Sequence, residues 1–276
     1  MPSLVLRSAI RTSIALAVAT AAGAPRVAAQ VAVLSSTVEE HTAVPGDSYS
    51  ARIVVSNPGT TPEVVRLYQT DYLFASDGTS HFDEPGKIPR SNAGWISLQS
   101  TQVTIPPGTT ANIPYTVTVP RADSLRGSYW STVMVEGAVR PPQTTGAEAG
   151  HKAQVGIGTA VRYAIQVATH IGSSGTRSVQ FVGTAAQRAS DGGSTVVLDV
   201  HDVGERAYRP TLWIEVYDSL GALRGKARQS RGLLYPGTSL RQTFDLGKLQ
   251  PGTYKAVIFA DTGEDSVYAS QYTVVF

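Results

Sequence analysis

Apolar and polar residues alternate along most of the chain after residue 30, and this alternation predicts β-strands that bury one face. The clearest alternating segments are 49–55, 64–72, 111–119 and 129–135 in the first half, and 195–203, 210–217, 240–246, 254–261 and 267–275 in the second. Turn-forming residues such as those of Asn57-Pro58-Gly59 separate the segments. After residue 30 no segment shows a convincing helical period. We therefore expect an all-β protein.

Turn and strand motifs recur in the same order in the two halves of the chain. Pro107-Gly108-Thr109 precedes one alternating strand, and Pro236-Gly237-Thr238 precedes another. Each half also has a glycine shortly before a tyrosine that opens an apolar strand, at Tyr129 and Tyr254. Repeats at such long spacing indicate two related domains rather than a solenoid. We expect two consecutive immunoglobulin-like β-sandwiches, over residues 30–172 and 177–276.

Residues 1–29 have the features of a secretory signal peptide. Arg7 and Arg11 precede an apolar run over 13–24, and small residues at 27–29 form a cleavage site. Removal of this segment lowers Lys+Arg from 23 to 20 and leaves Asp+Glu at 21. The mature chain is then near neutral, with no basic field for nucleic acid or an anionic membrane. We expect a periplasmic or otherwise extracytoplasmic protein whose mature chain does not insert into a membrane.

The sequence carries no pattern typical of an active site or a cofactor site. Cysteine is absent, which excludes disulfides, thiolate metal sites and a cysteine nucleophile. The five histidines lack metal-ligand spacing, and no Gly-x-Ser-x-Gly elbow occurs. Acids at 83–84 and 261–265 are conceivable calcium ligands, although solvated turn acids are the favoured interpretation. We expect a protein that is not an enzyme, with no catalytic residues, metal or cofactor.

The longest alternating segment is Val155–Ile171. Its odd-numbered positions form an apolar row that includes Val161, Tyr163, Ile165 and Val167. Such a row is either the buried face of a sandwich strand or an exposed edge that binds a partner. The pattern leaves both interpretations open, and exposure of the row separates them.

The order of landmarks in residues 30–172 resembles that of the PapD-like periplasmic pilus-assembly chaperones. The residues that carry the resemblance are the first strand Val31–Ser36, Pro45-Gly46 before Ile53–Asn57, Trp95 before Val103–Gly108, Gly127-Ser128-Tyr129, and the long alternating strand. A second sandwich completes the two-domain plan of that family. A weaker likeness is to the ectodomains of Gram-positive surface proteins that interact with WxL proteins.

In such chaperones an edge strand donates apolar side chains to an incomplete subunit sandwich, and two basic residues in a cleft hold the subunit's terminal carboxylate. By position, the resemblance implies partner-binding roles for the long strand, with Arg162 as one basic residue beside Val161, Tyr163, Ile165 and Val167. The first strand, Val31–Ser36, has no basic residue to serve as the other.

We therefore expect an exported protein-binding module whose partner is an envelope or pilin-like subunit bound by strand addition. The alternative is an envelope or cell-surface structural or adhesion module without chaperone activity. A buried Val161–Val167 row favours the alternative. Among the aromatic residues, Tyr129 and Tyr254 are expected to form tyrosine corners, and Trp130 is the candidate for an exposed tryptophan.

Overall fold

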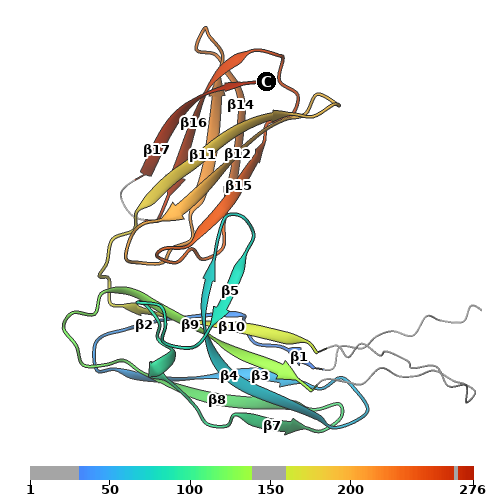
Figure 1. Ribbon diagram of the computed structural model, residues 1–276, viewed down its shortest axis with the longest axis vertical. Coiled ribbons are helices and arrows are strands. Elements are labelled where there is room, and N and C mark those ends of the chain that lie inside the picture. The colour runs from blue at the N-terminus through green and yellow to red at the C-terminus, as the bar shows by residue number, and fades with distance from the viewer. Residues whose placement is uncertain (1–30, 139–159, 264–266) are drawn as a thin grey trace, which may run out of the picture.

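The computed structural model describes residues 31–138, 160–263 and 267–276, and nearly all of its regular structure is β-strand (Figure 1). One short 3₁₀ helix, η1 (Ala93–Trp95), interrupts the strands of the described residues. The all-β expectation is confirmed, and the strands form two immunoglobulin-like sandwiches. The expected signal peptide (1–29) and most of the segment between 137 and 160 lie outside the described residues.

Strands β1 to β10 form the two sheets of the first sandwich. One sheet has the order β1-β3-β8-β6, with bounds Ala32–Val33, Ser48–Ser56, Thr110–Thr118 and Ile96–Leu98. The other has the order β2-β10-β9-β4-β5, with bounds Val38–Ala43, Arg162–Ile171, Gly127–Gly137, Glu63–Phe74 and Ser80–Asp83. β7 (Gln102–Ile105) also pairs with β4. Neighbouring strands are antiparallel, except that β2 runs parallel to β10.

Strands β11 to β17 form the second sandwich. Its three-stranded sheet has the order β11-β12-β15, with bounds Val179–Arg188, Ser194–Asp202 and Ser239–Asp245. Its four-stranded sheet has the order β14-β13-β16-β17, with bounds Leu223–Ser230, Thr211–Tyr217, Thr253–Asp261 and Val267–Val275. The Tyr254 hydroxyl donates to the Gln250 carbonyl oxygen at 2.7 Å, which is the bond of a tyrosine corner.

Each sandwich has its own apolar core between its sheets, because alternate side chains of every strand point inward. The core of the first sandwich includes Ile53, Val65, Ile113, Val133 and Ile165. The core of the second includes Val196, Leu198, Leu212, Ile214 and Ile258. These two cores fix the relative positions of the strands, and the face of each strand follows from its period of two.

A third apolar cluster joins the two sandwiches. Trp130 of β9 stacks on Tyr235 of the second sandwich, with ring centroids 4.7 Å apart. The Trp130 side chain is 1% exposed, and its Nε1–H donates to the Tyr72 carbonyl oxygen at 2.7 Å. The prediction of an exposed Trp130 was therefore wrong. The alternation placed this residue on the outer face of its sheet, and the second sandwich covers that face.

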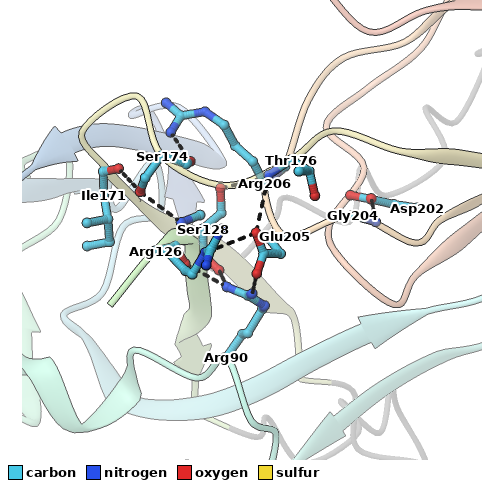
Figure 2. A network of polar contacts seen from close by, with 12 residues as sticks. Arg90, Arg126, Ser128, Ile171, Ser174, Thr176, Asp202, Gly204, Glu205 and Arg206 are labelled. Carbon is cyan, nitrogen blue, oxygen red and sulfur yellow. Dashed lines mark hydrogen bonds and ion pairs between the residues drawn. The ribbon is translucent and has the colours of Figure 1, made fainter. Parts of the chain in front are cut away.

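Polar contacts around Glu205, in the β12–β13 loop, also join the sandwiches (Figure 2). Its carboxylate pairs with Arg126 Nε at 3.1 Å and lies 3.9 Å from Arg90 Nη2. Its carbonyl oxygen accepts the Ser128 N–H at 2.8 Å, and its own N–H donates to the Thr176 carbonyl oxygen at 2.7 Å. Backbone and side chain together thus clamp the connection between the sandwiches against the start of β9.

The long connection after β5 is ordered by one buried carboxylate. Asp71, near the end of β4, accepts backbone N–H groups from Gly86, Lys87 and Ile88 at 3.1, 2.6 and 2.8 Å. The Ser91 hydroxyl donates to the same carboxylate. A carboxylate with this many donors holds a segment that has weak strand periodicity of its own.

Replacing Asp71 by asparagine is expected to lower the free energy of unfolding by about 2–4 kcal/mol. Several charge-assisted hydrogen bonds become weaker neutral ones, and the new amide turns N–H groups toward N–H donors. Urea unfolding measures the change, with Asp123→Asn at an exposed site as the matched control. Equal stability of the two variants would contradict the anchoring role of Asp71.

Candidate functional site

Within the described residues, the first half of β10 has a free backbone edge. β10 pairs with β9 along its whole length, from Arg162 to Ile171. On its other side it pairs with β2 only from Gln166 to Ile171. Among the described residues, the stretch from Arg162 to Ile165 therefore has a strand on one side only.

The direction of the hydrogen bonds shows which groups face the free edge. Gly137 N–H donates to the Val161 carbonyl oxygen, so odd-numbered residues of β10 face β9. Gln166 N–H donates to the Thr37 carbonyl oxygen, so even-numbered residues face the β2 side. By this alternation Arg162 and Ala164 turn their N–H and C=O groups toward the free edge.

The path of the first strand explains why the edge is free. β1 pairs with β3 in one sheet, and the chain then crosses to the other sheet, where β2 pairs with β10. The crossing occupies residues 34–37, which belong to no strand. Because β2 begins only after this crossing, it covers only the second half of the β10 edge.

The predicted apolar row does not point outward. Ile165 and Val167 are 0% and 1% exposed and belong to the core of the first sandwich. Tyr163 packs against the same core, and its hydroxyl donates to the Val31 carbonyl oxygen at 2.9 Å. Val161 is half-buried. Ile165 and Val167 thus fill the core of their own domain, and the part of β10 without a partner among the described residues is its backbone edge.

Arg162 lies on the opposite face of β10 and is exposed. Its Nε forms an ion pair with Glu136 Oε2 across the strands at 3.1 Å. Glu136 also accepts the Tyr68 hydroxyl at 2.8 Å. The guanidinium thus belongs to a cross-strand network next to the free edge.

An apolar groove of about 460 Å³ lies between the two sandwiches at the inner end of the free edge. The β4–β5 hairpin forms one wall as it reaches toward the second sandwich (Figure 1), and the Ser76 N–H donates to Ser239 Oγ there at 2.9 Å. The groove includes Gln166 and Val38, the pair at which β2 begins to cover β10. Its apolar lining is Val38, Tyr72, Phe74, Ala75, Leu233 and Leu240.

Gln166 is held in this groove by a residue of the second sandwich. The buried Tyr235 hydroxyl donates to Gln166 Oε1 at 2.8 Å. That bond orients the side-chain amide, since the oxygen is fixed and the NH₂ group points elsewhere. The free edge, Gln166 and the groove are continuous and form the candidate site.

A serine–histidine–carboxylate series also lies at the junction. Ser128 Oγ is 2.7 Å from His170 Nδ1, and His170 Nε2 is 3.3 Å from Glu40 Oε2. The Ser128 side chain is buried, and its Oγ accepts the Ala207 N–H at 2.9 Å. Glu40 in turn pairs with Arg209 of the second sandwich. The series connects the domains and presents no accessible nucleophile.

Burial lowers the pKa of His170, and the positive charges of Arg206 and Arg177 act in the same direction. The hydrogen bond that His170 Nε2–H donates to the Glu40 carboxylate opposes this shift. The neutral imidazole fits the geometry, with Ser128 and Glu40 on its two nitrogens. Among the described residues no group of three or more His, Cys, Asp or Glu side chains is arranged to hold a metal ion. Residues 264 and 265 of the 261–265 turn lie outside the described residues.

Asp202, at the end of β12 near the junction, gives the fold a pH dependence. It is 1% exposed, and burial raises its pKa from 3.8 to about 7. Its Oδ1 accepts the Gly204 N–H at 2.8 Å, while Oδ2 has no hydrogen-bond partner among the described residues. Because its pKa is raised in the folded state, protonated Asp202 adds to the free energy of unfolding. This contribution is complete below pH 3.8 and is lost as the pH rises through about 7.

Asp202→Asn is therefore expected to be increasingly more stable than the parent as the pH rises from 4 to 8. Urea unfolding of both proteins across this range measures the difference, with Asp191→Asn at an exposed turn as the control. A difference that is the same at every pH would contradict ionisation of a buried Asp202.

No protein-family model and no curated protein matches the chain. Among solved structures it is similar to the class 5 fimbriae chaperone CfaA, with 11% identity over 89% of this chain and 99% of that chain and a TM-score of 0.42. It is also similar to a Salmonella enterica structure of the SafA pilin with the SafB chaperone (11% identity, 89% and 96% covered, TM-score 0.40). A third is the Pseudomonas aeruginosa CupB2 chaperone (9% identity, 87% and 98% covered, TM-score 0.37).

These neighbours are PapD-like fimbrial chaperones, as the sequence resemblance implied. At such low identities and TM-scores the likeness concerns the general fold alone. None of the helices in the described ranges is long and apolar enough to cross a membrane.

Proposed function

We propose that this protein is an exported binding module that takes a partner polypeptide as an added strand on the free edge of β10. The observation that carries the proposal is the half-covered edge: β2 pairs with β10 from Gln166 onward, and Arg162 and Ala164 face an unpaired side. Strand addition gains affinity from backbone hydrogen bonds and specificity from alternate side chains. A partner such as an envelope or pilin-like subunit and a periplasmic location agree with the chaperone-like fold.

The alternative is a structural or adhesion module of the envelope. The burial of Ile165 and Val167 favours it, because the apolar row that would be donated to a subunit is occupied in the core. The clamped junction around Glu205 is also suited to a rigid spacer. Partner binding that depends on the β10 backbone edge separates the two functions.

Ala164→Pro is expected to weaken partner binding and to leave the fold intact. Proline removes the Ala164 N–H, which faces the free edge and has no partner among the described residues. Binding of the tagged mature protein to subunits from an envelope extract, followed by dissociation constants for the captured protein, measures the effect. We expect a loss of at least about tenfold, the effect of about 1.4 kcal/mol.

Ala164→Ser is the matched control, since it changes the same side chain and keeps the N–H. It is expected to bind as the parent does, and circular dichroism should show both variants folded. If Ala164→Pro binds a partner as tightly as Ala164→Ser, strand addition at this edge is wrong. If none of the three proteins binds a specific partner, the structural module is the better account.

A further inference from the structure

The interdomain groove has a chemistry that selects among partner strands. We infer that the added strand ends in the groove with a bulky apolar side chain followed closely by an acidic residue. This inference rests on the proposed strand addition and names the partner sequence that the same site accepts. Three features of the groove carry it: its place on the path of the strand, its apolar lining and its charge.

The groove lies where an added strand must end. A strand that pairs with Arg162 and Ala164 runs along the free edge until it meets Val38, the first residue of β2. Val38 and its register partner Gln166 both line the groove. On the face of the sheet that carries Gln166, the last side chain of the added strand therefore lies at the groove. There it is beside the Gln166 amide that Tyr235 orients.

The lining and the volume fit a large apolar side chain. Tyr72 and Phe74 come from the hairpin of the first sandwich, and Leu233 and Leu240 come from the second. At about 460 Å³ the space exceeds one methyl or isopropyl group and is in the range of small-ligand pockets. Burial of an aromatic or leucine side chain here removes apolar surface of both partners from water.

The charge of the groove is positive. Arg231 and Arg241 line it, and no acidic residue of the described part of the chain does. Arg241 is matched by Asp199, with Nε–Oδ1 and Nη2–Oδ2 distances of 2.8 and 3.0 Å. Arg231 has no ion-pair partner among the described residues and is partly exposed at the groove. A carboxylate next to the inserted apolar side chain would complement this guanidinium.

A phage-displayed library of random linear peptides tests the inference without a known partner. Peptides are selected on the parent protein, and those that also bind Ala164→Pro are removed, which leaves peptides that depend on the β10 edge. Among these we expect enrichment, by about tenfold over the library, of a bulky apolar residue with Asp or Glu within two positions.

Two variants test the groove directly. Arg231→Glu reverses the rim charge and should select Lys or Arg in place of the acidic residue. Ala75→Trp fills the groove from the hairpin and should remove the preference for a bulky apolar residue, while binding stays sensitive to Ala164→Pro.

The outcomes separate this inference from the proposed function. The groove inference is overturned if the edge-dependent peptides lack the apolar–acidic motif. It is also overturned if peptides selected on Arg231→Glu still prefer an acidic residue. Both results leave strand addition in place. If no selected peptide depends on the Ala164 N–H, strand addition and the groove inference both fail.

Discussion

Gly127→Ala is expected to break the junction between the two sandwiches. Gly127 has a φ of +74°, and a Cβ on it would lie 1.9 Å from the Glu205 carbonyl oxygen. The adjacent Ser128 N–H donates to that same carbonyl. A methyl group can be accommodated only if the β12–β13 loop moves away, which removes this bond and the ion pairs of Glu205 with Arg126 and Arg90.

We expect the free energy of unfolding to fall by more than about 4 kcal/mol, a loss seen when backbone strain and steric overlap combine. Urea unfolding measures it, and limited proteolysis of the linker at 173–176 reports separation of the sandwiches. Gly108→Ala is the matched control, because Gly108 has a φ of +64° and no atom of the described residues lies within 4 Å of its Cβ position. If both variants lose the same stability, the close contact with Glu205 contributes nothing.

Ile165→Asp is expected to unfold the first sandwich. The Ile165 side chain is fully buried between the sheets, and an isolated carboxylate there has no partner to offset its desolvation. We expect a loss of more than about 4 kcal/mol, whereas Ile165→Val removes one methylene and should cost about 0.5–1.5 kcal/mol. Thermal unfolding followed by circular dichroism measures both.

The result also decides how the long strand is used. A soluble, fully folded Ile165→Asp protein would mean that the side chain is exposed and that the apolar row is available to a partner. Loss of folding in Ile165→Asp, with a mild effect of Ile165→Val, places the row in the core and leaves the backbone edge as the binding element.

Local patterns predicted much of the fold. The period of two correctly placed Ile165 and Val167 on one face of a long strand, and the repeated turn motifs indicated two sandwiches. A glycine shortly before Tyr254 at the start of a late strand predicted a tyrosine corner, and the Tyr254 hydroxyl donates to a backbone carbonyl oxygen as expected. Each of these features depends on residues that are close together in the sequence.

The candidate site depends on contacts between distant residues. The free edge of β10 exists because the chain crosses between sheets at residues 34–37, more than a hundred positions earlier. Trp130 was assigned to the correct face, but only the second sandwich decides that this face is covered. The groove combines the β4–β5 hairpin with residues near 233 and 240, so no local signal marks it.

The roles of two buried carboxylates also could not be predicted from the sequence. Asp71 ends a strand pattern and has the appearance of a turn acid, yet it anchors the segment from Gly86 to Ser91. Asp202 occupies the same kind of position at the end of β12 and has a raised pKa because it is buried. Their roles follow from tertiary packing, which a period of two does not encode.

Amide hydrogen exchange along β10 tests the central claim most directly, and it needs only the protein itself. The account predicts fast exchange of the Arg162 and Ala164 N–H groups and slow exchange of those of Tyr163 and Ile165, which face β9. From Gln166 onward every N–H should be slow, because β2 covers the second side.

The expected ratio between fast and slow positions is on the order of a hundredfold, which corresponds to about 2.7 kcal/mol of protecting free energy. Alternating fast and slow exchange up to Ile165, followed by uniform protection, would establish the half-covered edge. Uniformly slow exchange from Arg162 to Ile171 would show that the edge is already paired, and strand addition to β10 would then be contradicted.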